Sequence, residues 1–222
     1  MKTDQPDPTM ARKTKEEAEK TYFALLEAAA DLYSSQGYAR TTINEIASHA
    51  GMTRGAFYWH FQSKEDVIKG IWENHAYPGF NPVRQALISL PKDDPASAFR
   101  VQINRLIDVF ARDRLVSRAM FIIIHNMEIS DKEGDLHQFL SEQHQMFQDT
   151  IATAFKSIEK AGQLKANMDP KVTALSCLCL FVGMVEKALL PFMELDLETE
   201  GKELFASFFD AVLEIEPQRT KT

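Results

Sequence analysis

The segment Thr41–Val67, TTINEIASHAGMTRGAFYWHFQSKEDV, restricts the fold more than any other part of the chain, because three helix starts and one glycine fall within it. Each start is marked by a hydroxyl residue of the type that caps a helix N-terminus, and these residues are Thr42, Thr53 and Ser63. Gly51 supplies the backbone freedom that a sharp turn between the first two helices requires. The segment therefore predicts a helix-turn-helix followed at once by another helix.

Helical patterns continue through the rest of the chain, and no stretch alternates apolar and polar residues as a half-buried strand does. About nine helices are expected, near residues 15–36, 43–50, 54–61, 64–78, 95–113, 115–127, 131–161, 169–190 and 198–214. Pro78 and Pro82 are expected to end or kink the fourth. We predict an all-α fold, with a disordered tail at residues 1–10, an N-terminal three-helix helix-turn-helix domain at residues 11–62 and a C-terminal helical domain at residues 63–222.

Three features of the sequence indicate a protein of the cytoplasm. The longest apolar stretch, around Ala174–Val185, is interrupted by Ser176 and Gly183, so no membrane span is expected. The first ten residues contain no apolar segment of the kind found in secretory signals. Cys177 and Cys179 lie two residues apart on an expected helix, point to different faces and are not expected to form a disulfide, which fits a reducing compartment.

The net charge of −7 argues against nucleic acid until its distribution is considered. Between Gln36 and Lys64, the cations Arg40, Arg54 and Lys64 outnumber the single anion Glu45. The charge beside the phosphates matters more for electrostatic attraction than the total charge does. This segment is therefore compatible with DNA contact within an acidic chain.

The helix expected after Thr53 has the composition of a DNA-recognition helix. Arg54 can donate two hydrogen bonds to a guanine edge, and Gly55 leaves room for the backbone to approach the bases. Groups that can reach phosphates follow on Tyr58, Trp59, His60 and Lys64. The alternative is that these are ordinary surface or packing residues. Phe57 and Phe61, four residues apart, are expected in the core.

These residues resemble the DNA-binding signature of the TetR family of transcriptional repressors. The arm RKTKEEAEKT and the core TRGAFYWHF resemble its multidrug-efflux-repressor (AcrR-like) branch. The motif covers about residues 11–70, whereas the likeness over the C-terminal two thirds rests on helix number and length. The resemblance implies an all-α homodimer that represses an efflux operon from a near-palindromic double-stranded DNA operator, and that a small lipophilic compound releases. It assigns the DNA contacts to Thr42, Thr53, Arg54, Gly55, Tyr58, His60 and Lys64, with Trp59 as a further candidate.

The C-terminal region is rich in Phe and Met, which is more often typical of a plain core than of a ligand cavity. The resemblance favours a cavity between helices. Its expected wall consists of Met120, Ile123, Ile124, Leu178, Phe181, Val182 and Val185. Because these positions are largely aliphatic, the expected effector is a neutral or weakly polar aromatic compound. The alternative is a C-terminal domain that only dimerises, in a constitutive DNA-binding protein or an activator without a ligand.

The last two helices are predicted to form the dimer interface. Small residues on the first would allow close approach, and a broad apolar stripe on the second would supply area. These residues are Ala174, Ser176, Cys177, Leu204, Phe205, Phe208, Phe209, Val212 and Leu213. The alternative is that this stripe only completes the core of one subunit. The sequence contains no P-loop, GxGxxG, GxSxG or HExxH, so no catalytic residue, metal ligand or cofactor is predicted and the chain is not expected to be an enzyme.

Overall fold

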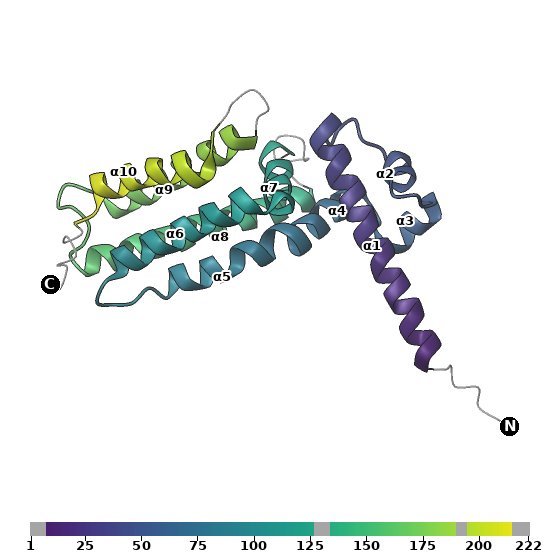
Figure 1. Cartoon of the computed structure of the whole chain (residues 1–222), viewed down its shortest axis with the longest axis horizontal. Coiled ribbons are helices and arrows are strands. Elements are labelled where there is room, and N and C mark those ends of the chain that lie inside the picture. Colours follow the sequence, from purple (N-terminus) through teal and green to yellow (C-terminus); the bar gives the residue numbers. More distant parts are fainter. Residues whose placement is uncertain (1–7, 127–133, 190–194, 215–222) are drawn as a thin grey trace.

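The structure, a computed structural model, describes residues 8–126, 134–189 and 195–214. The first helices are α1 (Pro8–Gln36), α2 (Ile43–His49), α3 (Arg54–His60) and α4 (Lys64–Ile71). After the π-helical turn η1 (Trp72–Ala76) come α5 (Tyr77–Ile88), α6 (Pro95–Arg112), α7 (Arg114–Asn126), α8 (Asp135–Lys160) and α9 (Pro170–Leu189), and a second π-helical turn, η2 (Leu197–Gly201), precedes α10 (Lys202–Val212). Figure 1 shows α1, α2 and α3 grouped at one end of the molecule and a bundle of α5, α6, α8, α9 and α10 at the other, with α4 and α7 between them. The all-α prediction is confirmed for the described residues.

The local geometry of the helix-turn-helix follows from its capping residues. The Thr42 hydroxyl accepts a hydrogen bond from the Glu45 N–H and the Glu45 carboxylate accepts one from the Thr42 N–H, so the capping box that starts α2 is complete. Thr53 and Ser63 cap α3 and α4 as predicted. Gly51 has a φ of 69°, a left-handed conformation that a residue with a Cβ adopts only with strain. Short polar caps and one glycine therefore set the angle between α2 and α3.

α1 is longer than its sequence pattern predicts. It begins at Pro8, not near Lys15, so residues 8–10 are helical and the predicted tail is wrong there. Residues 1–7 lie outside the described residues. Proline is tolerated at the first position of a helix, because the N–H that it lacks would have no partner there.

The helix that begins with α4 continues past Pro78 and Pro82, with a π-helical turn just before them. α4, η1 and α5 follow one another without a break, with Pro78 in the first turn of α5 and Pro82 inside it. Within η1 the Tyr77 N–H bonds to the Trp72 carbonyl five residues back, as in a π-helix. The predicted kink is therefore a π-helical turn within a single helical rod that starts beside α3 and runs into the C-terminal bundle.

Two apolar clusters hold the fold together. One lies within the bundle and contains Phe99, Phe155 and Phe205. The other surrounds the helix-turn-helix and contains Phe57, but it continues through α4 and η1 to Ile122 and other residues of α7 and α8. The domain boundary after residue 62 stays a prediction, since the core around the DNA-binding helices is shared with the C-terminal segment.

The apolar stripe of α10 lies mostly inside its own subunit. Phe205, Phe209, Val212 and Leu213 are buried in the bundle core, as are Ala174 and Cys177 of α9. The prediction that these residues face a second subunit is wrong, because α10 needs this stripe to cover α6 and α9. Leu204 remains exposed, Ser176 is exposed and Phe208 is half-buried.

The exposed apolar surface is instead concentrated on α9. Val172, Leu175 and Val182 are 62%, 54% and 38% exposed, and Cys179 is exposed between them. α9 is long and apolar enough to cross a membrane, and the interruptions at Ser176 and Gly183 do not change this. Length and composition alone do not separate a span from a core helix, and α9 packs along α8 with its buried face. Cys177 and Cys179 are both unbridged, as predicted.

Candidate nucleic-acid interface and C-terminal cavities

α3 divides its residues between the core and the solvent. Phe57 and Phe61 are buried, as predicted, and their rings contact each other. Thr53, Arg54, Gly55, Tyr58 and Trp59 are exposed. The helix is therefore held from behind by two phenylalanines while its N-terminal half and one side stay open to a partner.

Arg54 and Tyr58 form a pair on this open side. The Arg54 Nη2 donates to the Tyr58 hydroxyl at 3.1 Å, and the guanidinium lies 5.3 Å from the centre of the Tyr58 ring. The tyrosine thus orients the guanidinium and leaves most of its five N–H donors available. A planar fork held in this way suits bidentate bonding to a guanine edge or a phosphate.

The neighbouring residues leave a broad surface for contact. A Cβ built at Gly55 meets only the Thr53 hydroxyl, at 3.7 Å, so packing within the chain does not require glycine there. Trp59 is 73% exposed, and its ring packs edge-on against His60. Partial burial lowers the pKa of His60, so its imidazole is mainly neutral near pH 7 and offers a hydrogen bond in place of a charge.

Lys64 has an internal role that the sequence did not reveal. Its ammonium donates to the carbonyls of Tyr38 at 2.9 Å and Thr41 at 2.7 Å, and lies 4.3 Å from the Tyr38 ring centre. Burial lowers the pKa of Lys64, although nearby Glu45 opposes this shift. Since an ammonium has three donors, one remains for a phosphate. Phosphate contact by Lys64, like the other predicted contacts, stays a prediction.

We expect Lys64→Met to destabilise the protein by about 1–2 kcal/mol, because two carbonyls lose a charge-assisted donor at a partly exposed site. Urea unfolding followed by circular dichroism measures this loss. Lys69→Met, on the same helix, is the matched control and should change the stability by less than about 0.5 kcal/mol. Equal stability of the two variants would contradict an anchoring role for Lys64.

The residues predicted to line a ligand cavity are not gathered around one space. Leu178 and Phe181 border a cavity of about 30 Å³ between α5, α6, α8 and α9, which is enough for one water molecule. Met120 and Ile123 pack in the cluster around the helix-turn-helix. Val185 is buried in the bundle core, whereas Val182 lies on the outer face of α9 and lines neither this cavity nor the larger one. The side chain of Ile124 lies outside the described residues.

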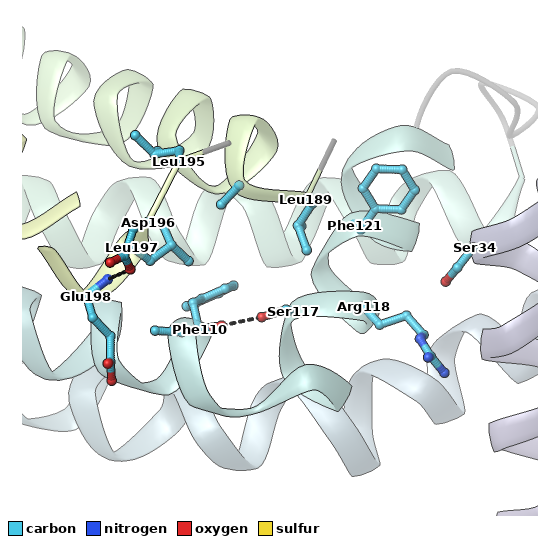
Figure 2. A pocket seen from close by; sticks show the side chains of 12 residues that line it. Ser34, Phe110, Ser117, Arg118, Phe121, Leu189, Leu195, Asp196, Leu197 and Glu198 are labelled. Carbon is cyan, nitrogen blue, oxygen red and sulfur yellow. Dashed lines mark hydrogen bonds between the residues drawn. The ribbon is translucent and has the colours of Figure 1, made fainter. Parts of the chain in front are cut away.

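A larger pocket of about 610 Å³ lies elsewhere in the C-terminal part, within the size range of sites for small molecules. Figure 2 shows its wall, which α1, α6, α7, the end of α9 and η2 all help to form. Its lining residues are Ser34, Phe110, Ala111, Ser117, Arg118, Phe121, Ala188, Leu189, Leu195, Asp196, Leu197 and Glu198. None of them was predicted, because the pocket depends on the meeting of five segments. The one signal in the sequence is Arg118, a cation within the apolar run of α7.

Residues 25–71 match the family model described as bacterial regulatory proteins, tetR family. The HTH-type transcriptional regulator AcrR of Shigella flexneri is 29% identical over 204 residues, which are 92% of this chain and 94% of that protein.

Two solved structures extend the likeness over most of the chain. One is SmeT, the repressor of the Stenotrophomonas maltophilia multidrug efflux pump SmeDEF, in its complex with triclosan. It superposes on this chain with a TM-score of 0.70 at 25% identity, and the match covers 91% of this chain and 97% of SmeT. AibR in complex with isovaleryl coenzyme A and operator DNA has a TM-score of 0.69 at 25% identity, covering 85% of this chain and 98% of AibR. The helix-turn-helix segment therefore matches the tetR family of bacterial regulatory proteins, and the whole chain is similar in sequence and fold to regulators such as AcrR and SmeT.

Proposed function

We propose that this protein is a cytoplasmic transcriptional repressor that binds a near-palindromic operator as a homodimer and leaves it when a small lipophilic compound binds. The observation that carries this proposal is the open side of α3, where Thr53, Arg54, Gly55 and Tyr58 face solvent while Phe57 fixes the helix from behind. The match of residues 25–71 to the tetR family model and the similarity to AcrR support it. Resemblance to the efflux-repressor branch makes a multidrug efflux operon the proposed target.

Two copies of α3 are needed to read a palindromic site. Half-sites lie about 34–36 Å apart along the DNA, which a dimer matches by placing its recognition helices one helical turn apart. The exposed apolar face of α9, with Val172, Leu175 and Val182, is the surface that we propose a second copy covers. These residues follow at intervals of three and seven, as along the seam between two packed helices.

The rod formed by α4, η1 and α5 is the proposed route from effector to operator. Its first part contacts α1 and its last part contacts α6 and α8, so a shift in the bundle can tilt α4 and move α3. An effector changes the operator affinity only by its differential affinity for the two positions of this rod. The π-helical turn η1 lies between α4 and α5, and we propose that it is the hinge about which α4 tilts.

A selection from a random duplex library at moderate ionic strength, followed by Arg54→Ala, tests the proposal. We expect this variant to lose about 1–3 kcal/mol of specific binding, because the guanidinium that reads a base edge is removed. Arg54→Lys is the control that keeps the charge: it should retain the salt dependence but lose affinity, since an ammonium lacks the planar pair of donors that matches a guanine edge. Fluorescence anisotropy measures both. Undiminished affinity in Arg54→Ala would remove this residue from the interface.

Gly55→Leu should separate folding from binding. Leucine has the higher helix propensity and the chain offers open space at this position, so stability should be unchanged or raised by about 0.5–1 kcal/mol. Operator affinity should fall by about 1–3 kcal/mol, the usual result of forcing methylenes into a close-packed contact. Thermal unfolding and anisotropy on the same preparation measure the two effects. Unchanged affinity would show that the backbone of α3 does not approach the bases.

The second candidate function is DNA binding without a small-molecule ligand. It is favoured by the cavity beside Leu178 and Phe181, which has a volume of only about 30 Å³. A bundle interior filled in this way between α5, α6, α8 and α9 fits a constitutive DNA-binding dimer or an activator without a small-molecule ligand. Thermal-shift measurements with lipophilic drugs and dyes separate the two functions, since a ligand that binds only the folded state raises the melting temperature.

A further inference from the structure

One acidic residue connects the DNA-binding helices to the C-terminal segment. The Asp31 carboxylate on α1 accepts a hydrogen bond from Arg118 Nη1 on α7, and its other oxygen lies 3.6 Å from His49 Nε2 on α2. The Arg118 side chain is 32% exposed, so solvent or a ligand can reach it. Asp31 thus lies between Arg118, with which it forms an ion pair, and His49, which belongs to a different part of the molecule.

The larger pocket lies directly beside this ion pair. Ser34, one turn after Asp31 on α1, and Arg118 form the end of the pocket next to α1, and Figure 2 shows Arg118 reaching from α7 on that side. Phe110, Phe121 and Leu189 supply an apolar middle. A space of about 610 Å³ with an apolar middle and a cation at one end has the form of a site for an amphiphile.

The carboxylates at the other end of the pocket already have hydrogen-bond partners within the chain. Glu198 accepts a hydrogen bond from Arg112 Nε at 2.5 Å. The Asp196 carboxylate caps η2 by accepting from the Glu198 N–H at 2.9 Å and from the Thr199 hydroxyl at 2.7 Å. Arg118 is therefore the charged group of the pocket whose partner a ligand can replace. An incoming carboxylate can take the place of Asp31 at Arg118, while Asp31 stays beside His49.

We propose that this pocket binds an anionic amphiphile, whose aromatic or aliphatic body lies among Phe110, Phe121 and Leu189 and whose carboxylate bonds to Arg118 in place of Asp31. Loss of the Asp31–Arg118 ion pair then weakens the polar contact between α1 and α7 while their apolar packing remains, so that α1 can shift relative to α7. This inference rests on the proposed function for its effect on DNA, and it replaces the neutral effector expected from the aliphatic sequence with an acidic one.

Three naphthalene probes that differ only in the head group test the charge preference: 2-naphthoate, 2-naphthylmethanol and 2-naphthylmethylammonium. Isothermal titration calorimetry on the full-length protein should give an affinity for naphthoate about tenfold above that for the alcohol, as expected for a charge-assisted hydrogen bond at a partly exposed site. The ammonium should bind more weakly than either. Equal affinities for the anion and the alcohol, or a preference for the ammonium, would overturn the inference.

Variants of the ion pair distinguish competition from a merely structural role. Arg118→Gln should abolish the preference for naphthoate and leave binding of the alcohol unchanged. Asp31→Asn should tighten naphthoate binding several-fold, because the carboxylate that competes for Arg118 is removed. A structural role predicts the opposite for Asp31→Asn, since loosening the pocket weakens every probe. Arg100→Gln is the matched control: Arg100 also pairs between helices, with Asp210 at 3.8 Å, but does not line the pocket, so the preference should persist.

Anisotropy with a selected operator separates this inference from the proposed function. Release of the operator by naphthoate, but not by the alcohol at equal occupancy, supports both. A protein that prefers naphthoate but no DNA sequence would overturn the proposed function and support the pocket assignment. Release by a neutral drug, with no naphthoate preference, would overturn the anionic pocket and support the proposed function.

Discussion

Leu175→Glu is expected to convert the protein from a dimer into a monomer. Leu175 is 54% exposed at the centre of the apolar face of α9, where Val172 and Val182 extend the same surface. A carboxylate there would be buried against a second copy without a partner, which costs far more than the contact contributes. Since a monomer binds one half-site, operator affinity should fall by about 10²–10⁴-fold, the usual loss when two linked contacts become one.

Sedimentation velocity at micromolar concentration measures the change in mass, and anisotropy on the same samples measures the change in affinity. Val101→Glu is the matched control, because Val101 is an apolar residue 60% exposed on α6 that belongs to no part of the α9 face. That variant should stay dimeric and bind the operator normally. A dimeric Leu175→Glu variant would place the interface elsewhere.

The helix-turn-helix was predictable from the sequence because its determinants are local. A capping side chain bonds to a backbone N–H within three residues, so Thr42, Thr53 and Ser63 mark the starts of helices that the structure contains. The turn depends in the same local way on the positive φ of Gly51. The limits of α1 were less predictable. A run of charged residues after Pro8 neither favours nor forbids a helix strongly, and the apolar stripe that marks the helix begins later.

The C-terminal cavities and the dimer surface could not be predicted in the same way. An apolar helix shows which residues avoid water but not which element covers them, and α9 is apolar nearly all around. Cys177 and Leu175 look alike in the pattern, yet one is buried by its own subunit and the other is exposed. The role of Lys64 also depends on carbonyls more than twenty residues away along the chain, which no local rule anticipates.

Phe57→Ala is expected to lower the stability by about 3–5 kcal/mol, the range typical for removing a buried phenylalanine. Phe57 is completely buried, contacts the Tyr58 and Phe61 rings and lies in the cluster that joins α1, α2 and α4. Because this cluster continues into α7 and α8, the loss should be felt by the whole chain and not by the DNA-binding helices alone.

Urea unfolding with two probes tests this coupling. Trp59 is exposed on α3, whereas Trp72 is buried in η1 and its ring contacts Phe147 of α8. Tryptophan fluorescence therefore reports mainly on the junction between the DNA-binding helices and the bundle, whereas circular dichroism at 222 nm reports on all helices. The two transitions should shift together in Phe57→Ala, and Phe155→Ala, in the other cluster, should shift both as well. If the fluorescence transition alone moved in Phe57→Ala, the shared core would not couple the two parts. The rod of α4, η1 and α5 would then be their main mechanical connection, and an effector in the bundle would act on α3 through that rod alone.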